Sequence, residues 1–150
     1  KSADGGGPSL VRMENSADGP FAWRPSVSTD GSPGIDDGIS FKGDPLGDQD
    51  HDGLVDWVEF VLGTDQAPAW PVLTVEEKGD QLLIRHPKNL AAMGVQLGLE
   101  ASVDLMEWSP APDHEQVDRV YLENGMANEW LELPKTGQER YLRLQIRNVE

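Results

Sequence analysis

The chain has 150 residues, of which 37% are hydrophobic, so it can hold one domain of ordinary size plus an appendage, and two full domains would be crowded. Twelve Lys and Arg against 27 Asp and Glu give a formal charge of −15, which argues against nucleic acid or an anionic membrane as the partner. The absence of cysteine excludes disulfides, zinc–thiolate sites and thiol catalysis, and no apolar run is long enough to predict membrane insertion.

The first 47 residues differ in composition from the rest of the chain. They contain 9 of the 16 glycines and 5 of the 11 prolines. They offer one predicted strand at Ser9–Glu14 and a second near Phe21–Trp23, which is too little to enclose a core. We therefore expect residues 1–47 to form a separate segment that leans on another part of the protein or is mobile.

Residues 48–59 read D-Q-D-H-D-G-L-V-D-W-V-E and match the calcium-binding loop of an EF-hand at every ligand position. A hard cation is held by several oxygens, so alternate side chains must converge while a glycine, here Gly53, allows the sharp turn. The predicted ligands are the side chains of Asp48, Asp50, Asp52, Asp56 and Glu59 and the backbone carbonyl of Leu54.

An ordinary acidic surface turn is the alternative reading of this loop, because Asp and Gly are common turn residues. A chance turn does not require five carboxylates in this register, and so many negative charges close together repel one another. No Lys or Arg lies between Gly43 and Asp65 to neutralise them. The composition therefore favours a bound cation.

The last residues of the loop and those that follow it predict a short helix, and the residues before the loop predict none. D-W-V-E-F-V-L at 56–62 is apolar and free of Pro and Gly, and Gly63 is expected to end the helix. Gly43, Pro45 and Gly47 oppose a helix entering the loop. The unit therefore resembles a half EF-hand of the dockerin and thrombospondin type 3 kind. Without a second loop, a structural calcium is favoured over a paired sensor.

The remainder of the chain predicts short strands separated by turns. Alternation is clear where Leu142, Leu144 and Ile146 share one face. The pattern indicates a mainly β fold, an antiparallel immunoglobulin- or fibronectin III-like β-sandwich preceded by the half EF-hand loop and its helix. No cysteine pair exists, so an antibody-type domain is excluded. The predicted strands are Val72–Glu77, Gln81–His86, Val95–Val103, Val117–Leu122, Asn128–Leu133 and Arg140–Arg147.

Several short motifs accompany the calcium loop. They are Leu62-Gly63-Thr64-Asp65 at the helix end, Ser102, Asp104, Leu105 and Trp108 in the β region, Arg140–Leu144 in the last strand, and a Gly-rich opening at 5–15 followed by W-R-P-S and G-S-P-G. Together they resemble the C-terminal region of secreted Verrucomicrobia and Planctomycetes proteins, in which an aspartate-rich calcium loop precedes a β-sandwich. The opening resembles the end of a lamin-tail domain. The resemblance implies that residues 1–47 are the remnant of an upstream domain, 48–66 the calcium unit and 67–150 the β-sandwich.

Tryptophan and histidine are the other residue types that could carry a binding site or chemistry. Exposed tryptophans can stack on sugars, although most tryptophans in small domains are buried. Trp130 is the best candidate, because its neighbours Leu131 and Leu133 take the inward positions, and Trp70 is second. The three histidines are scattered, with no nucleophile or metal partner nearby in sequence, and we expect them to be structural or at the surface.

These observations lead to two hypotheses of different classes. The first is a non-catalytic, calcium-binding accessory module that stabilises or positions a larger secreted or surface protein, with neighbouring domains of that protein as its partners. The alternative is a calcium-stabilised carbohydrate-binding module that contacts polysaccharide through exposed tryptophans. An enzyme is disfavoured because no catalytic constellation is present. A weak calcium site is filled outside the cell and empty in a resting cytosol, which favours the extracellular setting.

Overall fold

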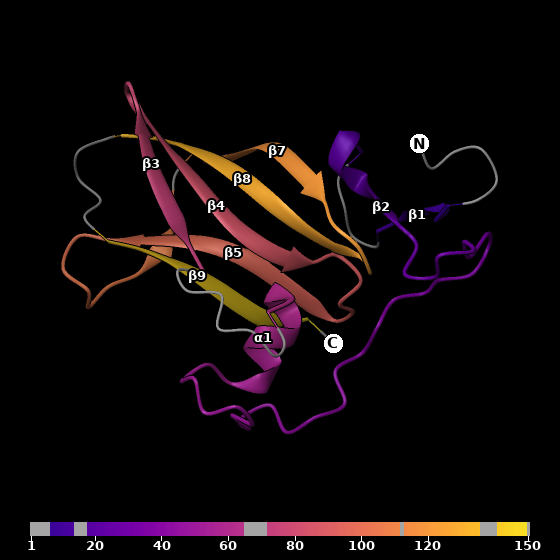
Figure 1. Ribbon diagram of the computed structural model, residues 1–150. Coiled ribbons are helices and arrows are strands. Elements are labelled where there is room, and N and C mark those ends of the chain that lie inside the picture. Colours follow the sequence, from indigo (N-terminus) through magenta and orange to yellow (C-terminus); the bar gives the residue numbers. More distant parts are fainter. Residues whose placement is uncertain (1–6, 14–17, 65–71, 112, 136–140, 150) are drawn as a thin grey trace.

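The computed structural model describes residues 7–13, 18–64, 72–111, 113–135 and 141–149 (Figure 1). The prediction of a mainly β chain with antiparallel sheets and one short α-helix is confirmed. The elements are β1 (Leu10–Arg12), the 3-10 turn η1 (Pro20–Ala22), β2 (Trp23–Pro25), α1 (Asp56–Leu62), β3 (Thr74–Lys78), β4 (Gln81–Asn89), β5 (Val95–Ser102), β6 (Ser109–Pro110), β7 (Glu115–Tyr121), β8 (Met126–Pro134) and β9 (Tyr141–Asn148).

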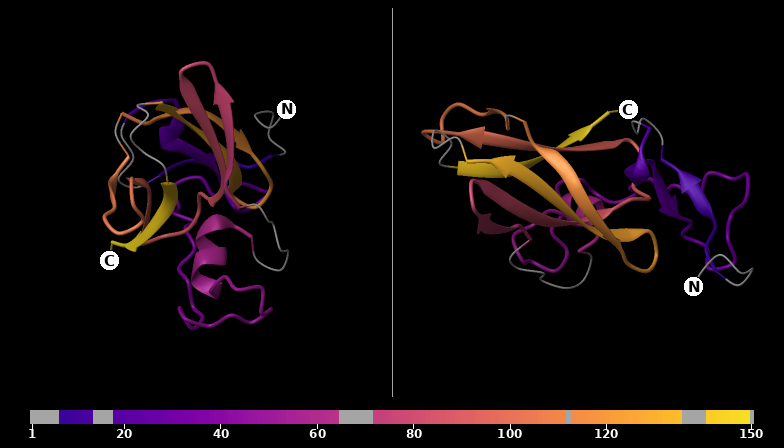
Figure 2. Two further views of the ribbon diagram at one scale, coloured as in Figure 1. Left: turned by 90° about the vertical axis from the view of Figure 1, so that its left-hand side faces the viewer. Right: turned by 90° about the horizontal axis from the view of Figure 1, so that it is seen from above.

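The strands form three antiparallel sheets. The largest has the order β3-β4-β8-β7, the second has the order β6-β5-β9, and β1 pairs with β2 in a separate two-stranded sheet. The two larger sheets make the body of the molecule, and the β1–β2 sheet lies beside one end of that body (Figure 2). An isolated parallel bridge between Ile39 and Ala92 connects the segment before α1 to the turn after β4.

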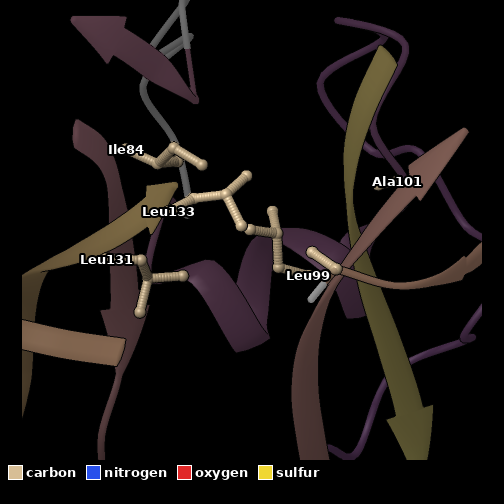
Figure 3. Close-up of a cluster of buried hydrophobic side chains, with 6 residues drawn as sticks. Ile84, Leu99, Ala101, Leu131 and Leu133 are labelled. Carbon is tan, nitrogen blue, oxygen red and sulfur yellow. The ribbon is translucent and has the colours of Figure 1, made fainter. Parts of the chain in front are cut away.

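The two larger sheets contribute to one apolar cluster (Figure 3). Ile84 and Leu131 project from the four-stranded sheet, and Leu99 and Ala101 project from the three-stranded sheet toward them. Burial alternates along β8, where Ala127, Glu129, Leu131 and Leu133 are buried and the residues between them are partly exposed. Because successive strand residues point to opposite faces, this period of two is what brings one face of each sheet to the core.

The predicted strands occur with shifted ends. All six predicted after the helix are present, and β4 continues past its predicted end at His86 to Asn89. The expected strand near Phe21–Trp23 is displaced, since Phe21 lies in η1 and the strand begins at Trp23. The short β6 was not predicted, because two residues carry no periodicity. Arg140, the predicted start of the last strand, lies outside the described residues.

Only one half of the inner face of the four-stranded sheet is apolar. In the other half, Glu129 is 3% exposed and lies opposite His86 on β4 and Arg119 on β7. Arg119 Nε donates to Glu129 Oε1 at 2.8 Å, and Lys88 Nζ lies 3.3 Å from Glu129 Oε2. The carboxylate is therefore buried within a set of positively charged and polar groups, which is the condition under which burial of a charge is tolerated.

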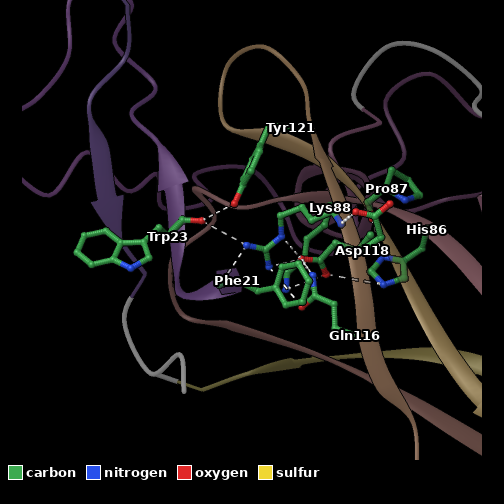
Figure 4. Close-up of polar contacts among 10 residues, drawn as sticks. Phe21, Trp23, His86, Pro87, Lys88, Gln116, Asp118 and Tyr121 are labelled. Carbon is green, nitrogen blue, oxygen red and sulfur yellow. Dashed lines mark hydrogen bonds and ion pairs between the residues drawn. The ribbon is translucent and has the colours of Figure 1, made fainter. Parts of the chain in front are cut away.

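The same arginine contacts the N-terminal segment (Figure 4). Arg119 Nη1 donates to the carbonyl of Phe21 at 2.8 Å, and its guanidinium lies 5.4 Å from the centre of the Phe21 ring. The hydroxyl of Tyr121 donates to the carbonyl of Trp23 at 3.0 Å. Residues 20–23 thus lie against the polar half of the sheet. The described residues before residue 48, called the N-terminal segment from here on, therefore contact the two larger sheets, called the β domain, through backbone carbonyls.

Burial also affects the ionisation of the polar cluster. Burial lowers the pKa of His86, whose side chain is only 1% exposed. In its neutral form His86 adds no positive charge to the cluster. Burial alone would raise the pKa of Glu129, but the charges of Lys88 and Arg119 outweigh it and hold that pKa below its usual value. The cluster therefore contains an ionised glutamate beside a neutral histidine at neutral pH.

We predict that stability falls as the pH is lowered below about 6.5, the ordinary pKa of histidine. Unfolded His86 takes up a proton there while folded His86 remains neutral, so protonation favours the unfolded state, at most by about 1.4 kcal/mol per pH unit. Urea unfolding at pH 7.5, 6.5 and 5.5 measures the slope. His86→Gln should have a shallower slope than the parent in this range, and equal slopes would contradict the role of His86.

A second prediction separates the two contacts of Arg119. Arg119→Met leaves Glu129 buried with one fewer cation and should destabilise the protein by about 3–5 kcal/mol. The double change Arg119→Met with Glu129→Leu removes the unpaired charge and should recover most of that loss in chemical denaturation. It should not restore the hydrogen bonds that Arg119 Nη1 donates to the carbonyls of Phe21 and Trp23, so amide exchange in residues 21–24 should stay faster than in the parent. Parent-like exchange in the double variant would show that Arg119 does not hold this segment.

Candidate metal-binding loop

The backbone of residues 48–54 is folded by its own aspartates. Asp48 Oδ2 accepts from the N–H of Gly53 at 3.3 Å, and Asp52 Oδ1 accepts from the N–H of Leu54 at 2.8 Å. Positive φ values at His51 (61°) and Gly53 (96°) let the chain reverse. Between residues 40 and 55 the described backbone contains no helix, as expected from the glycines and proline before the loop.

Three carboxylates converge inside this turn. One oxygen from each of Asp48, Asp50 and Asp52 lies within 4.8 Å of the others. Asp48 Oδ1 is buried and accepts no hydrogen bond among the described residues. No described Lys or Arg forms an ion pair with any of the three. The donor set is all oxygen and negatively charged, which fits a hard divalent cation rather than a soft transition metal.

The other predicted ligands lie outside this group of three. Asp56 begins α1, and its Oδ1 accepts from the N–H of Gln49 at 2.8 Å while its own N–H donates to the carbonyl of Gly47 at 2.7 Å. Glu59 is buried in the following turn of α1. Metal ligation by Leu54, Asp56 and Glu59 therefore stays a prediction, and in the described geometry Asp56 closes the loop.

Helix α1 is fixed to the β domain, and the loop is fixed with it. Val61 and Leu62 are buried, and Asn89 at the end of β4 donates from Nδ2 to the carbonyl of Phe60 at 3.1 Å. The Phe60 ring lies 5.4 Å from the ring of Phe41, which precedes the loop. Gly63 ends the helix in the left-handed conformation with its N–H donating to Glu59 O, as predicted from its position.

The described contacts do not support a carbohydrate-binding role for the predicted tryptophans. Leu131 and Leu133 do point inward, so Trp130 lies on the outer face of the four-stranded sheet. It is only partly exposed, and the guanidinium of Arg85 lies 5.6 Å from its ring centre, over the face on which a sugar would stack. Trp70 lies outside the described residues, and the carbohydrate-binding hypothesis stays a prediction.

The cluster around Glu129 was not predicted as a unit. His86 was expected to be structural or at the surface, and it is buried. The alternation of side chains along a strand could have placed both residues on the inner face. His86 follows the inward-facing Ile84 by two residues, and Glu129 precedes the inward-facing Leu131 by two. The sequence does not say that β4 pairs with β8, so it cannot show that these two polar positions meet.

A cavity of about 560 Å³ lies between the N-terminal segment and the turn after β4. Its charged lining residues are already paired within the protein. Arg24 Nη1 lies 2.6 Å from Asp37 Oδ1, and Lys88 contacts Glu129. The nearby Arg24 holds the pKa of Asp37 below its usual value, against the opposing effect of burial. These pairs connect neighbouring segments of the chain. None of the residues that line the cavity belongs to the aspartate loop at 48–59, so the cavity is separate from the candidate metal site.

Comparisons with protein-family models, with curated proteins and with solved structures find no match to this chain. Within the described residues, no helix has the length and apolar character needed to cross a membrane. The function must therefore be argued from the site itself.

We predict that Gly47→Ala destabilises the loop even in the presence of chelator. A Cβ at this position would lie 2.7 Å from Asp56 Oδ2 and 3.2 Å from the carbonyl oxygen of Asp44. Moving Asp56 away breaks its bond with Gln49, a loss of about 1 kcal/mol in thermal or urea unfolding. Gly98→Ala is the matched control, because its Cβ meets nothing within 4 Å. Equal stability of both variants would refute the close approach at Gly47.

Proposed function

We propose that residues 48–59 bind one calcium ion and that the ion has a structural role in a non-catalytic accessory module. The observation that carries the proposal is the convergence of the Asp48, Asp50 and Asp52 carboxylates in a loop of EF-hand sequence. The ion would supply positive charge and fixed coordination, and no reaction is assigned to it.

The choice of calcium rests on the donors and their spacing. The three aspartates supply carboxylate oxygens, and the loop sequence adds the carbonyl of Leu54 and the carboxylates of Asp56 and Glu59. Asp56 stands at the position that in EF-hand loops often acts through a water molecule, which is compatible with the bond it accepts from Gln49. Six oxygen donors suit calcium, whereas magnesium is less often enclosed by protein ligands alone.

A structural role is supported over a sensory one by what surrounds the loop. A sensor EF-hand opens by changing the angle between two helices. Here residues 40–47, directly before the loop, contain no helix, and the exiting helix α1 is held by Asn89 and by the contact between Phe41 and Phe60. Cation binding would order the segment between residues 47 and 56 and so fix how the N-terminal segment joins the β domain.

The arrangement of strands supports a module of immunoglobulin or fibronectin III type. The orders β3-β4-β8-β7 and β6-β5-β9 correspond to the strands A, B, E, D and C′, C, F of that fold, with side chains of both sheets in one core. Such domains commonly occur as parts of larger secreted or surface proteins, and the calcium loop at the N-terminal boundary of this one would position it against its neighbour.

Calcium binding is tested by differential scanning calorimetry and titration calorimetry. The unfolding temperature should rise when chelator is replaced by calcium, because binding to the folded state alone adds RT ln(1 + [L]/Kd), about 2.7 kcal/mol at a hundredfold excess over Kd. Asp50→Asn, which removes one of the three converging charges at an exposed position, should abolish most of this rise. Glu59→Gln should weaken binding while leaving the β domain folded.

Asp30→Asn is the control for a general charge effect, since this aspartate is exposed and lies outside the loop. It should respond to calcium as the parent does. Identical melting curves in chelator and in calcium, with no heat on titration, would refute the proposal. A rise that Asp30→Asn loses as fully as Asp50→Asn would refute the assignment to this loop.

A further inference from the structure

The outer edge of β9 has no strand beside it among the described residues. The three-stranded sheet ends with β9, which pairs with β5 from Val95↔Asn148 to Ser102↔Tyr141 and with no other described strand. In the immunoglobulin arrangement one more strand lies at this position. An open strand edge presents unpaired N–H and C=O groups in a row, and such a row is a template for another strand.

Two hydrogen bonds show which residues of β9 direct their backbone N–H and C=O groups toward β5 and which direct them toward the open edge. The N–H of Val149 donates to Gly94 O at 2.9 Å, so odd-numbered residues of β9 direct their backbone groups toward β5. The N–H of Ala111 donates to Leu99 O, so Leu99 faces away from its partner Leu144. Even-numbered residues of β9 therefore direct N–H and C=O to the open edge, and no described residue bonds these groups of Leu142, Leu144 or Ile146.

The side chains on this edge are also incompletely covered. Leu142, Leu144 and Ile146 occupy the inner face of β9, and all three are partly exposed. Their partners on β5 include Leu99 and Ala101, which are 2% and 4% exposed. From Leu99 to Ala101, β5 is flanked by residues 109–111 as well as by β9, whereas β9 has a neighbour on one side only. A strand added beside β9 would cover apolar surface as well as pair backbone groups.

We propose that this edge binds the same edge of a second copy of the chain, as an antiparallel β9–β9′ pair centred on Leu144. In that register Leu144 lies opposite Leu144 of the second copy, and Leu142 lies opposite Ile146. All of these are residues whose N–H and C=O face the open edge, so each opposed pair exchanges two hydrogen bonds. Their side chains meet on the inner face, apolar against apolar.

The outer face selects the same register. Centring on Leu144 places Tyr141 opposite Arg147 and Arg143 opposite Gln145, with no like charges directly opposed. Sliding by two residues in one direction places Arg143 opposite Arg143, and in the other it places Arg143 opposite Arg147, both of which are destabilising. The sequence of β9 is therefore self-complementary in the register that pairs residues 141–147 with the same residues of the second copy.

The arginines on this face carry their own counter-charge. Arg143 Nη2 lies 2.7 Å from Glu100 Oε2, and Arg147 Nη2 lies 3.4 Å from Glu100 Oε1. The guanidinium of Arg143 also lies 4.1 Å from the ring centre of Trp108. Association is opposed mainly by the formal charge of −15 on each chain, which acts over long range and is screened by salt. The dimer should accordingly strengthen as salt is raised.

Sedimentation velocity over a concentration series, in calcium and at 50 and 300 mM NaCl, tests the proposal. The parent should show a monomer–dimer equilibrium that shifts toward dimer at the higher salt concentration. Ile146→Pro removes an N–H that faces the open edge and not the ladder with β5, so it should raise the dimer dissociation constant at least about tenfold while the domain stays folded.

Ile146→Val is the matched control, because it also shortens the side chain but keeps the N–H, and its dissociation constant should stay near that of the parent. Amide exchange in the parent dimer should be slowed at Leu144, whose N–H is otherwise open. A parent that is monomeric at every concentration, an equal loss of association in both variants, or a dimer with unprotected Leu144 would overturn the proposal.

Discussion

The burial of Glu129 is the constraint from which the placement of the other segments follows. A carboxylate on the inner face of a sheet must be matched by cations and donors, or its burial costs more than the fold can supply. Arg119 and Lys88 supply the positive charge from the two strands that flank β8. Arg119 has donors left over, and the carbonyl of Phe21 accepts one of them. The N-terminal segment therefore covers the end of the core where no apolar cluster could form.

The aspartate loop presents the opposite case, in which carboxylates gather with no described cation in contact. At Glu129 the protein balances one charge with its own side chains, whereas Asp48, Asp50 and Asp52 are held together by backbone N–H groups alone. These hydrogen bonds orient the oxygens but do not remove the repulsion between charges. The contrast supports an external cation at the loop. The chain neutralises the buried carboxylate of Glu129 with its own side chains, and it supplies no such side chain at the loop.

Local sequence predicted the elements whose cause is local. Gly63 ends α1 because a left-handed C-cap favours glycine, and Leu131 and Leu133 turn inward because strand side chains alternate. The order of the strands, and with it the meeting of His86 with Glu129, depends on pairing between residues far apart in the chain. Convergence of Asp48, Asp50 and Asp52 was foreseeable from spacing, but the engagement of Asp56 by Gln49 was not.

The aspartate loop depends on the apolar core more than the core depends on the loop. Ile84, Leu99 and Leu131 come from strands that pair directly or face one another, so their packing does not require the loop. The loop in turn is attached through α1, chiefly by the bond from Asn89 to Phe60 and the burial of the helix's apolar residues. Segments with few buried contacts open at lower free energy than the core. Removal of the cation proposed for this loop would therefore loosen the connection between the N-terminal segment and the β domain before it affected the sheets.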